Sequence, residues 1–153
     1  MYITLLTLHS LFRWLVLLAL IYSIYRSYKG YFGNQVFTRQ DNHFRHWTAT
    51  MAHIQFMIGV VLYFQSPIVK AFRMNLGSGA NDISLTFFGV IHVCLMLAGI
   101  FVLTLGSIKA KRKETDREKF KTMLIWFSLA LLIILLAIPW PFSPLAARPL
   151  FRI

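Results

Sequence analysis

Four long apolar runs constrain the fold of this chain more than any other feature of its sequence. They are separated by short polar segments and lie at about 3–25, 44–65, 84–107 and 122–139. A helix needs about 20 consecutive apolar residues to cross a bilayer, so each run is long enough, although the fourth is the shortest. Lipid leaves backbone groups without partners, so only helices or closed barrels span it, and continuous runs indicate helices.

The composition supports a membrane protein with a single domain. Of the 153 residues, 58% are hydrophobic and 14% are charged, against about half and about a quarter in a typical soluble domain. This excludes a disordered chain, a disulfide scaffold and an ordinary soluble enzyme. We expect an all-α fold, an integral membrane up-down four-helix bundle that comprises residues 1–153.

The positive charges are concentrated in two of the three segments between the runs. The net charge is +11 with neutral histidines. The loops at about 26–43 and 108–121 carry most of the Lys and Arg residues, whereas the second loop and the C-terminal tail carry two each. Because basic loops stay on the cytoplasmic side, both termini are predicted to be external. The distribution favours contacts with membrane lipid and argues against nucleic acid as a partner.

The second loop contains a glycine-bearing stretch, residues 75–82 (NLGSGAND). Its glycines follow no predicted strand, so they do not form a phosphate-binding fingerprint. We expect this stretch to be an external loop.

A short set of polar side chains lies inside the apolar runs, where each is costly and is a functional hypothesis by default. The set comprises His9, Arg13, His46, His53, Gln55 and His92. No Asp or Glu lies well inside a run, which argues against a proton-relay pump, a carboxylate-coupled transporter or a hydrolase with paired carboxylates. A hydrogen bond between helices explains Gln55 better than ligand binding does.

Three of the histidines are predicted to lie at similar depths. With a rise of 1.5 Å per residue, His9 lies roughly 9 Å, His92 roughly 12 Å and His53 roughly 18–20 Å below the external face. The first and third long helices of an up-down bundle face each other across its core. His9 and His92 are therefore placed to hold a haem between two imidazoles. His53 is a third candidate, which could replace either ligand or line a neighbouring quinone site.

Arg13 lies one turn below His9 and keeps its charge at a depth of roughly 15 Å. It needs an anionic or strongly polar partner, and the chain offers no intramembrane carboxylate. A haem propionate, a quinone oxygen, a lipid phosphate or a partner subunit could serve. The alternative is that the side chain snorkels to the external interface.

One face of the third predicted helix combines small residues with a histidine. This face comprises Gly89, His92, Met96, Gly99, Leu103 and Gly106. Small residues let a flat ligand approach the backbone, but they also mediate close packing between helices in lipid. For the glycines alone, helix packing is the better interpretation, and the histidine among them keeps a ligand site open.

Several local strings together resemble a known family. They are His9-Ser10-x-x-Arg13-Trp14, Ala52-His53-Ile54-Gln55 followed by Gly59-x-x-Leu62-Tyr63-Phe64-x-Ser66-Pro67, His92, and Ile138-Pro139-Trp140-Pro141-Phe142. With them the chain resembles, over most of its length, a family of small four-helix bacterial membrane proteins labelled cytochrome b-like. The resemblance implies a multi-pass protein of the bacterial inner membrane, with functional positions His9, Arg13, His53 and His92. Many members carry Glu just before the third-helix histidine, whereas this chain has Ile91.

These observations leave three functions open. The leading expectation is a membrane electron carrier that binds haem b and exchanges electrons with quinol or a respiratory partner. His9, His53 and His92 are then the candidate iron ligands, and Arg13 contacts a propionate or a quinone. A second expectation is a cofactor-free structural or assembly subunit of a larger membrane complex. A third is a histidine metal site or a small membrane oxidase, because three imidazoles could bind zinc, copper or iron directly.

Overall fold

The computed structural model describes residues 1–76 and 82–150, and both ranges are helical apart from short connections and the tail. The elements are α1 (Tyr2–Phe32), α2 (Arg39–Gln65), α3 (Pro67–Met74), α4 (Ile83–Thr86), the π-helical turn η1 (Phe87–Ile91), α5 (His92–Arg112) and α6 (Asp116–Ala137). No strand occurs in these two ranges. Most of the expected external loop at 75–82 lies outside the described residues, and so does Arg152.

Four helical segments are long and apolar enough to cross a membrane. They are α1, α2, the continuous segment Ile83–Arg112 and α6. The first three contain the runs at about 3–25, 44–65 and 84–107, and α6 covers the fourth run as far as Ala137, short of its expected end at 139. The predicted all-α class and the four candidate spans are confirmed. These spans support a multi-pass membrane protein.

Two of the helices begin before the apolar runs at about 44 and 122, because polar residues cap them. The hydroxyl of Thr38 accepts from the backbone N–H of Asp41, and the Asp41 carboxylate accepts from the backbone N–H of Thr38 (2.8 Å). Thr115 caps α6 by accepting from the backbone N–H of Glu118 (3.3 Å). The reciprocal cap at Thr38 and the single cap at Thr115 satisfy N–H groups that a helix start leaves open, and they allow polar residues to extend a helix.

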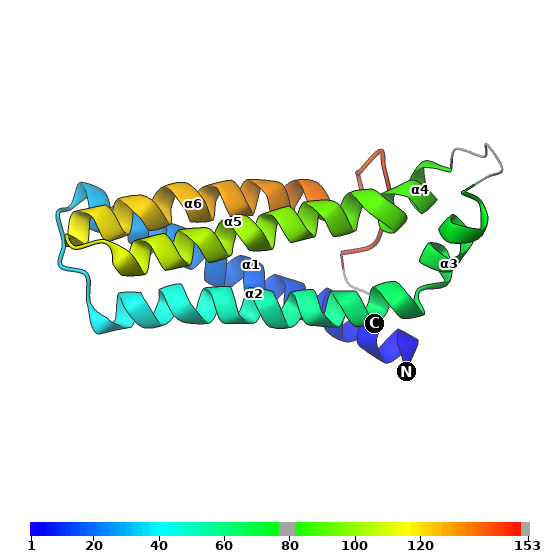
Figure 1. Ribbon diagram of the computed structural model, residues 1–153, viewed down its shortest axis with the longest axis horizontal. Coiled ribbons are helices and arrows are strands. Elements are labelled where there is room, and N and C mark those ends of the chain that lie inside the picture. Colours follow the sequence, from blue (N-terminus) through cyan, green and yellow to red (C-terminus); the bar gives the residue numbers. More distant parts are fainter. Residues whose placement is uncertain (77–81, 151–153) are drawn as a thin grey trace.

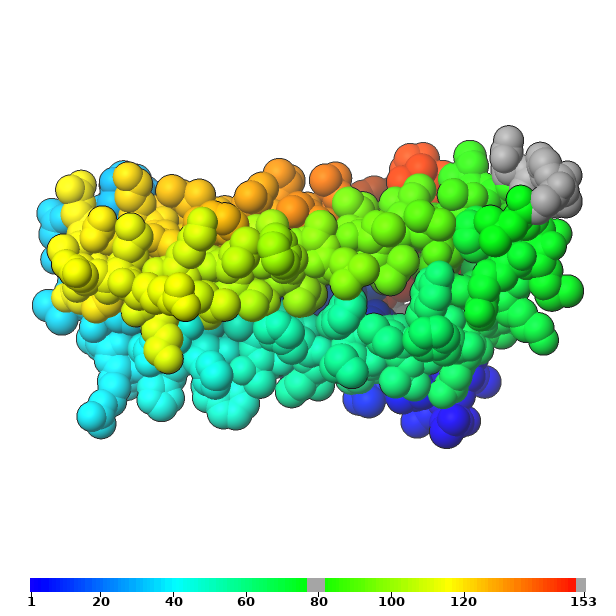
Figure 2. Space-filling model, in the orientation of Figure 1, coloured from blue at the N-terminus to red at the C-terminus, as the bar shows by residue number. Residues whose placement is uncertain are grey.

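The four long segments lie side by side along the longest axis of the molecule (Figure 1). α1 packs against α2 and α6, and α5 packs against the same two helices. α1 and α5 therefore occupy opposite corners of the assembly. In the space-filling view the surface is hollowed between α2 and α5, where part of α1 is visible behind them (Figure 2).

The core runs between α1, α5 and α6. Its fully buried apolar side chains include Leu20, Leu103, Phe127 and Ala130. Burial of such side chains, together with close van der Waals contact between helices, is what holds a helical membrane protein together once its spans are inserted.

The glycines on the histidine-bearing face of the Ile83–Arg112 segment let neighbouring elements approach closely. A Cβ added at Gly106 would lie 2.3 Å from the Cβ of Trp126 on α6. A Cβ added at Gly99 would lie 3.0 Å from the side chain of Ile134, which is also on α6. A Cβ added at Gly89 would lie 2.4 Å from an aromatic ring of α3. These glycines therefore serve packing between elements.

Buried polar groups at one end of the assembly bond to one another. We call this end, which holds the α1–α2 and α5–α6 connections, the polar end. Arg26 forms a salt bridge with Asp41, which is 2% exposed (Nε to Oδ1, 2.7 Å). Arg45, which is 5% exposed, donates to the backbone oxygen (3.0 Å) and to the hydroxyl (2.5 Å) of Ser107. These contacts tie α1 to α2 and α2 to α5.

Candidate functional site

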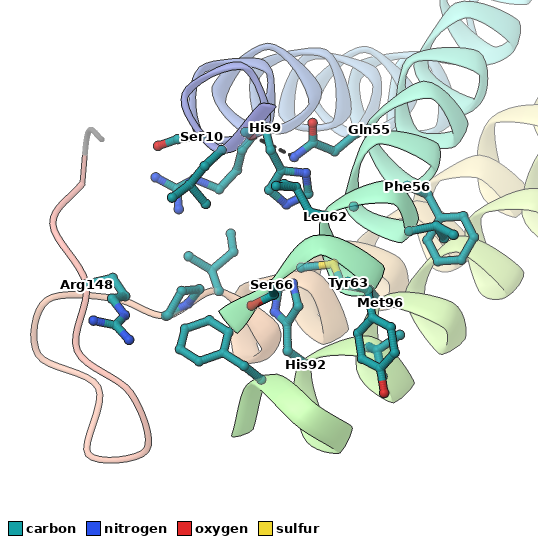
Figure 3. A pocket seen from close by; sticks show the side chains of 18 of the residues that line it. His9, Ser10, Gln55, Phe56, Leu62, Tyr63, Ser66, His92, Met96 and Arg148 are labelled. Atoms are coloured by element: carbon teal, nitrogen blue, oxygen red, sulfur yellow. Dashed lines mark hydrogen bonds between the residues drawn. The ribbon is translucent and has the colours of Figure 1, made fainter. Parts of the chain in front are cut away.

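A cavity of about 180 Å³ lies at the opposite end of the molecule, which we call the cavity end (Figure 3). It is enclosed by the first half of α1, the last half of α2, the start of α5, the end of α6 and the tail at 138–150. Most of its walls are apolar, and the polar side chains that line it are Tyr2, His9, Ser10, Arg13, Gln55, Tyr63, Ser66, His92 and Arg148. An apolar cavity with a few convergent polar groups is the usual form of a ligand site.

The imidazole of His9 points into this cavity from α1 (Figure 3). Its Nδ1 is buried and has no hydrogen-bond partner. Gly59 on α2 makes room for the ring, since an added Cβ there would lie 3.1 Å from His9 Cε1. Gln55 donates from Nε2 to the backbone oxygen of His9 (2.9 Å), which is the interhelical bond that the sequence suggested for this glutamine. The backbone of His9 is therefore held while its ring nitrogen stays open.

His92 enters the cavity from α5, at the corner opposite α1 (Figure 3). Its Nδ1 lies 2.7 Å from the backbone oxygen of Ala137. Because a carbonyl oxygen can only accept, Nδ1 carries the proton and Nε2 keeps its lone pair. This bond fixes the tautomer and the orientation of the ring, as the outer partner of a metal-binding histidine does.

The π-helical turn η1 immediately precedes His92. Such turns disturb the i→i−4 hydrogen-bond ladder and are frequent at functional sites. Here the hydroxyl of Tyr63 on α2 donates to the backbone oxygen of Gly89 within the turn (2.9 Å). Nothing in the sequence predicted this irregular turn, and it shifts the rotational register at which His92 leaves the segment.

Arg13 lines the cavity one turn beyond His9. It donates from Nη2 to the backbone oxygen of Leu150 in the tail (2.5 Å), and its Nε is buried without a hydrogen-bond partner. The guanidinium also lies 5.2 Å from the ring centre of Trp14. The side chain is thus turned toward the tail and the cavity, with one N–H still open for an acceptor.

Arg148 lines the cavity, although the sequence did not predict it as a site residue. It belongs to the tail, which folds back so that Ala146 is buried and the guanidinium of Arg148 lies 5.2 Å from the ring centre of Phe88. Pro139, Pro141 and Pro144 explain the end of α6 but not the path of the chain beyond it. The signal in the sequence that could have indicated it is a basic residue among the mostly apolar residues of the tail.

His53 lies outside the cavity. It is exposed on α2, where Nδ1 donates to the backbone oxygen of Ala49 (2.6 Å) and Nε2 contacts the hydroxyl of Thr104 on α5 (3.1 Å). His46 is exposed as well, next to Trp47. The structure brings together two of the three predicted imidazoles, and within the described ranges no group of three His, Cys, Asp or Glu is placed to hold a metal ion.

The charge of the cavity is positive or neutral. Its ionisable side chains are two imidazoles and two guanidiniums besides two tyrosine hydroxyls, and none of the described residues that line it is a carboxylate. The site can offer nitrogen lone pairs to a metal centre and N–H donors to anionic oxygens. Its walls provide apolar surface for the rest of a ligand.

Comparisons with known proteins found no matching family model, no similar curated protein and no similar solved structure. The chemistry of the cavity is therefore inferred from its own residues.

Proposed function

We propose that this protein is a membrane electron carrier that binds haem b and exchanges electrons with quinol or a respiratory partner. The observation that carries the proposal is that His9 and His92 point into one apolar cavity from opposite corners of the four helices. Two imidazoles from facing helices are one of the ligand sets that hold haem in helical bundles. The group would supply reversible one-electron chemistry.

The two ring environments support this assignment. The Nδ1–H bond from His92 to Ala137 leaves Nε2 as the electron-pair donor, in the orientation expected of a metal ligand. The buried Nδ1 of His9 has no partner in the protein, and a buried polar atom of this kind calls for an unseen partner. The resemblance of the sequence to the cytochrome b-like family also implies that His9 and His92 are functional positions.

The rest of the cavity would keep the site dry and set its electrostatics. The apolar walls exclude water and lower the local dielectric, which strengthens charge interactions inside. The positive charges of Arg13 and Arg148 favour the more negatively charged state of an occupant. We therefore assign the iron ligands to His9 and His92, while ligation by His53 stays a prediction from the sequence.

The topology that we propose is an up-down bundle in the inner membrane of a bacterium, with both termini external. The polar end carries the basic residues that precede and follow the α5–α6 connection, including Lys109, Lys111, Arg112, Lys113, Arg117, Lys119 and Lys121. Because positively charged segments stay in the cytoplasm, the polar end would be cytoplasmic and the cavity end external.

Visible spectroscopy of the purified protein tests the proposal. We expect a Soret band in the oxidised protein, sharp bands after reduction with dithionite, and protoporphyrin in a solvent extract. His9→Ala and His92→Ala should each lose these bands, whereas His46→Ala, which changes an exposed histidine, should keep them. A wild-type protein without a Soret band and without extractable porphyrin would contradict the proposal.

One observation favours a second function, that of a cofactor-free subunit of a larger membrane complex. The hydrogen-bonded pair of His53 and Thr104 lies on the outer surface of α2 and α5, within spans that would face lipid. Polar groups in hydrocarbon are costly, so a helix of another subunit that contacts this pair would stabilise it. Copurification of a large complex that His53→Leu disrupts, and that His9→Ala/His92→Ala leaves intact, would favour this function.

A further inference from the structure

The contact between α2 and α5 is open at the level of the cavity. In the space-filling view the surface is hollowed between the two helices, with part of α1 behind them (Figure 2). The side chains that these helices contribute to the middle of the cavity wall are apolar and only half-buried, and they are Phe56, Val60, Val93, Met96 and Ile100. On the other side of α5, buried Gly99 packs against buried Ile134 of α6. Because α2 and α5 belong to candidate spans, the open side, which we call the α2–α5 cleft, would face lipid.

His53 and Thr104 lie where this cleft continues toward the polar end. Residues three or four apart share a helix face, so His53 lies on the same face as Phe56, and Thr104 on the same face as Ile100. The two side chains meet across the cleft, with His53 Nε2 3.1 Å from the hydroxyl oxygen of Thr104. At 1.5 Å of rise per residue, the pair is roughly 5 Å along the helix axis from the nearest cavity-lining residues.

The protons of this pair leave one acceptor available to a ligand. Nδ1 of His53 lies 2.6 Å from the backbone oxygen of Ala49, which can only accept, so Nδ1 carries the proton and Nε2 has the lone pair. The hydroxyl of Thr104 has one proton for two acceptors, the backbone oxygen of Ile100 (2.7 Å) and His53 Nε2. A donor that reaches Nε2 from the cleft can therefore replace Thr104 there, because Thr104 keeps its bond to Ile100.

A hydroquinone with a lipid-soluble chain matches these features. Its hydroxyl groups donate, whereas the carbonyl oxygens of the oxidised quinone only accept. Its flat ring suits an apolar cleft whose wall includes an aromatic ring and an adaptable methionine. A hydroxyl inside hydrocarbon is costly without a partner, and Nε2 supplies that partner. The acyl chain of a phospholipid would fill the cleft but would donate nothing to Nε2.

We propose that the α2–α5 cleft is a quinol site that opens to lipid, in which a ring hydroxyl donates to His53 Nε2 and the ring lies along Phe56 and Ile100. This inference rests on the proposed function. It adds that the electron donor is a quinol, that it reaches the protein from the bilayer, and that His53 selects its reduced form. The ring is then next to the wall of the haem cavity.

Calorimetric titration of the full-length protein in lipid-containing micelles tests the site. The probes are decylubiquinol and diprenyl menaquinol, each with its oxidised quinone. The quinols are added to reduced protein and the quinones to oxidised protein, so that no electron transfer accompanies binding. We expect the wild type to bind at least one quinol about fivefold more tightly than its quinone, because one neutral hydrogen bond distinguishes the two forms.

His53→Leu removes the acceptor from an exposed position and should weaken quinol binding by about fivefold. It should change quinone binding by less than about twofold and keep the Soret band. Thr104→Val should keep the quinol affinity, because Nε2 can still accept. The matched control is His46→Leu, which removes an exposed histidine two turns away on the same helix and should change neither affinity.

The outcomes separate this inference from the proposed function. Equal binding of quinol and quinone by the wild type would overturn the site and leave haem binding in place, and this comparison needs no variant to fold. A protein without haem whose quinol binding depends on His53 would overturn the proposed function and support the site. Binding of no probe would overturn the site.

Three further results would assign the cleft or its histidine to something else and overturn the site. The first is loss of the Soret band in His53→Leu, which would make His53 an iron ligand. The second is displacement of the quinol by an equal concentration of lysophospholipid, which would assign the cleft to a lipid chain. The third is a membrane subunit that copurifies with the wild type and not with His53→Leu, which would assign the pair to a contact between helices.

Discussion

The polar end and the cavity end bury similar groups and treat them differently. At the polar end, Arg26 is paired with Asp41, and Arg45 bonds to Ser107. At the cavity end, His9 Nδ1 and Arg13 Nε are buried without partners. Nearly all buried polar groups in proteins are hydrogen-bonded, so those that are not require an explanation.

This difference gives a criterion that distinguishes structural from ligand-binding polar residues in a helical membrane protein, namely whether their hydrogen bonds are all made within the chain. A polar group whose bonds are all made within the chain contributes to stability and needs no further partner. A polar group that is left open beside a cavity is available to a ligand. By this criterion Arg45 is structural, whereas His9 and Arg13 are the candidate binding residues.

The largest expected effect comes from breaking the salt bridge of the polar end. Asp41→Ala removes the buried carboxylate that accepts from Arg26 and from the backbone N–H of Thr38, and it leaves Arg26 with only the side-chain oxygen of Gln35 as an acceptor. We expect the free energy of unfolding in mixed micelles to fall by about 3 kcal/mol, as for other broken buried pairs. Asp116→Asn is the control, because its ion pair with Lys119 is only half-buried and joins neighbouring turns of one helix, so it is worth about 0.5 kcal/mol. Equal effects of the two substitutions would contradict a structural role for the polar end.

The next largest effect comes from matched glycine substitutions, which should lower the free energy of unfolding by different amounts in the α5–α6 contact and at the cavity end. Gly106→Ala forces a Cβ to within 2.3 Å of the Trp126 Cβ, so α5 and α6 must separate, and we expect a loss of about 2 kcal/mol. Gly59→Ala meets the His9 ring at 3.1 Å and should cost less than about 1 kcal/mol, because the ring can shift into the cavity.

The same shift should weaken haem binding by Gly59→Ala, whereas Gly106→Ala should keep its spectrum wherever it folds. Unfolding measurements combined with haem titrations of both variants check this prediction. A Gly59→Ala protein with unchanged affinity would show that its His9 ring is not a ligand.

Removal of the Tyr63 hydroxyl should loosen the turn that precedes His92. Tyr63→Phe deletes the bond to the backbone oxygen of Gly89 and should cost about 1 kcal/mol. We expect faster hydrogen exchange over 87–92, and a shift in the redox midpoint of any bound haem. Unchanged exchange in this segment would mean that the π-helical turn is held by packing alone.

Removal of an unsatisfied group should cost the ligand-free protein little. His9→Leu replaces a ring whose buried Nδ1 makes no bond in the protein, and the backbone bond from Gln55 is retained. We expect the free energy of unfolding to change by less than about 1 kcal/mol, while haem no longer stabilises the variant. A large loss of ligand-free stability would place His9 among the structural residues.

The smallest expected effect is local and concerns Asp82, the exposed cap of α4. Bonds from the backbone N–H of Leu85 and from Ser84 hold the pKa of its carboxyl below the ordinary value. The cap is therefore fully present above the ordinary pKa of about 4 and is lost as the pH falls below it. The amide resonances of Ser84 and Leu85 should titrate in that acidic range. They should not titrate in Asp82→Asn, and a midpoint above the ordinary pKa would contradict the bonding seen here.

Sequence reasoning reached part of the site. His9 and His92 were predicted to face each other, and the structure places both rings at one cavity on helices at opposite corners. Arg13 was predicted to need an acceptor, and it has one in Leu150 with Nε still open. His53 was expected at a similar depth, but depth does not determine the direction in which a side chain leaves its helix.

The number of candidate spans was determined by the sequence alone, because the length of an apolar run and the thickness of a bilayer can be compared without knowing what the run touches. The tertiary structure decided which polar residues share a cavity. That outcome depends on the rotation of each helix about its axis, on the π-helical turn before His92, and on the tail that brings Arg148 back beside α1. All three are set by contacts between residues far apart in the chain, which hydropathy does not encode.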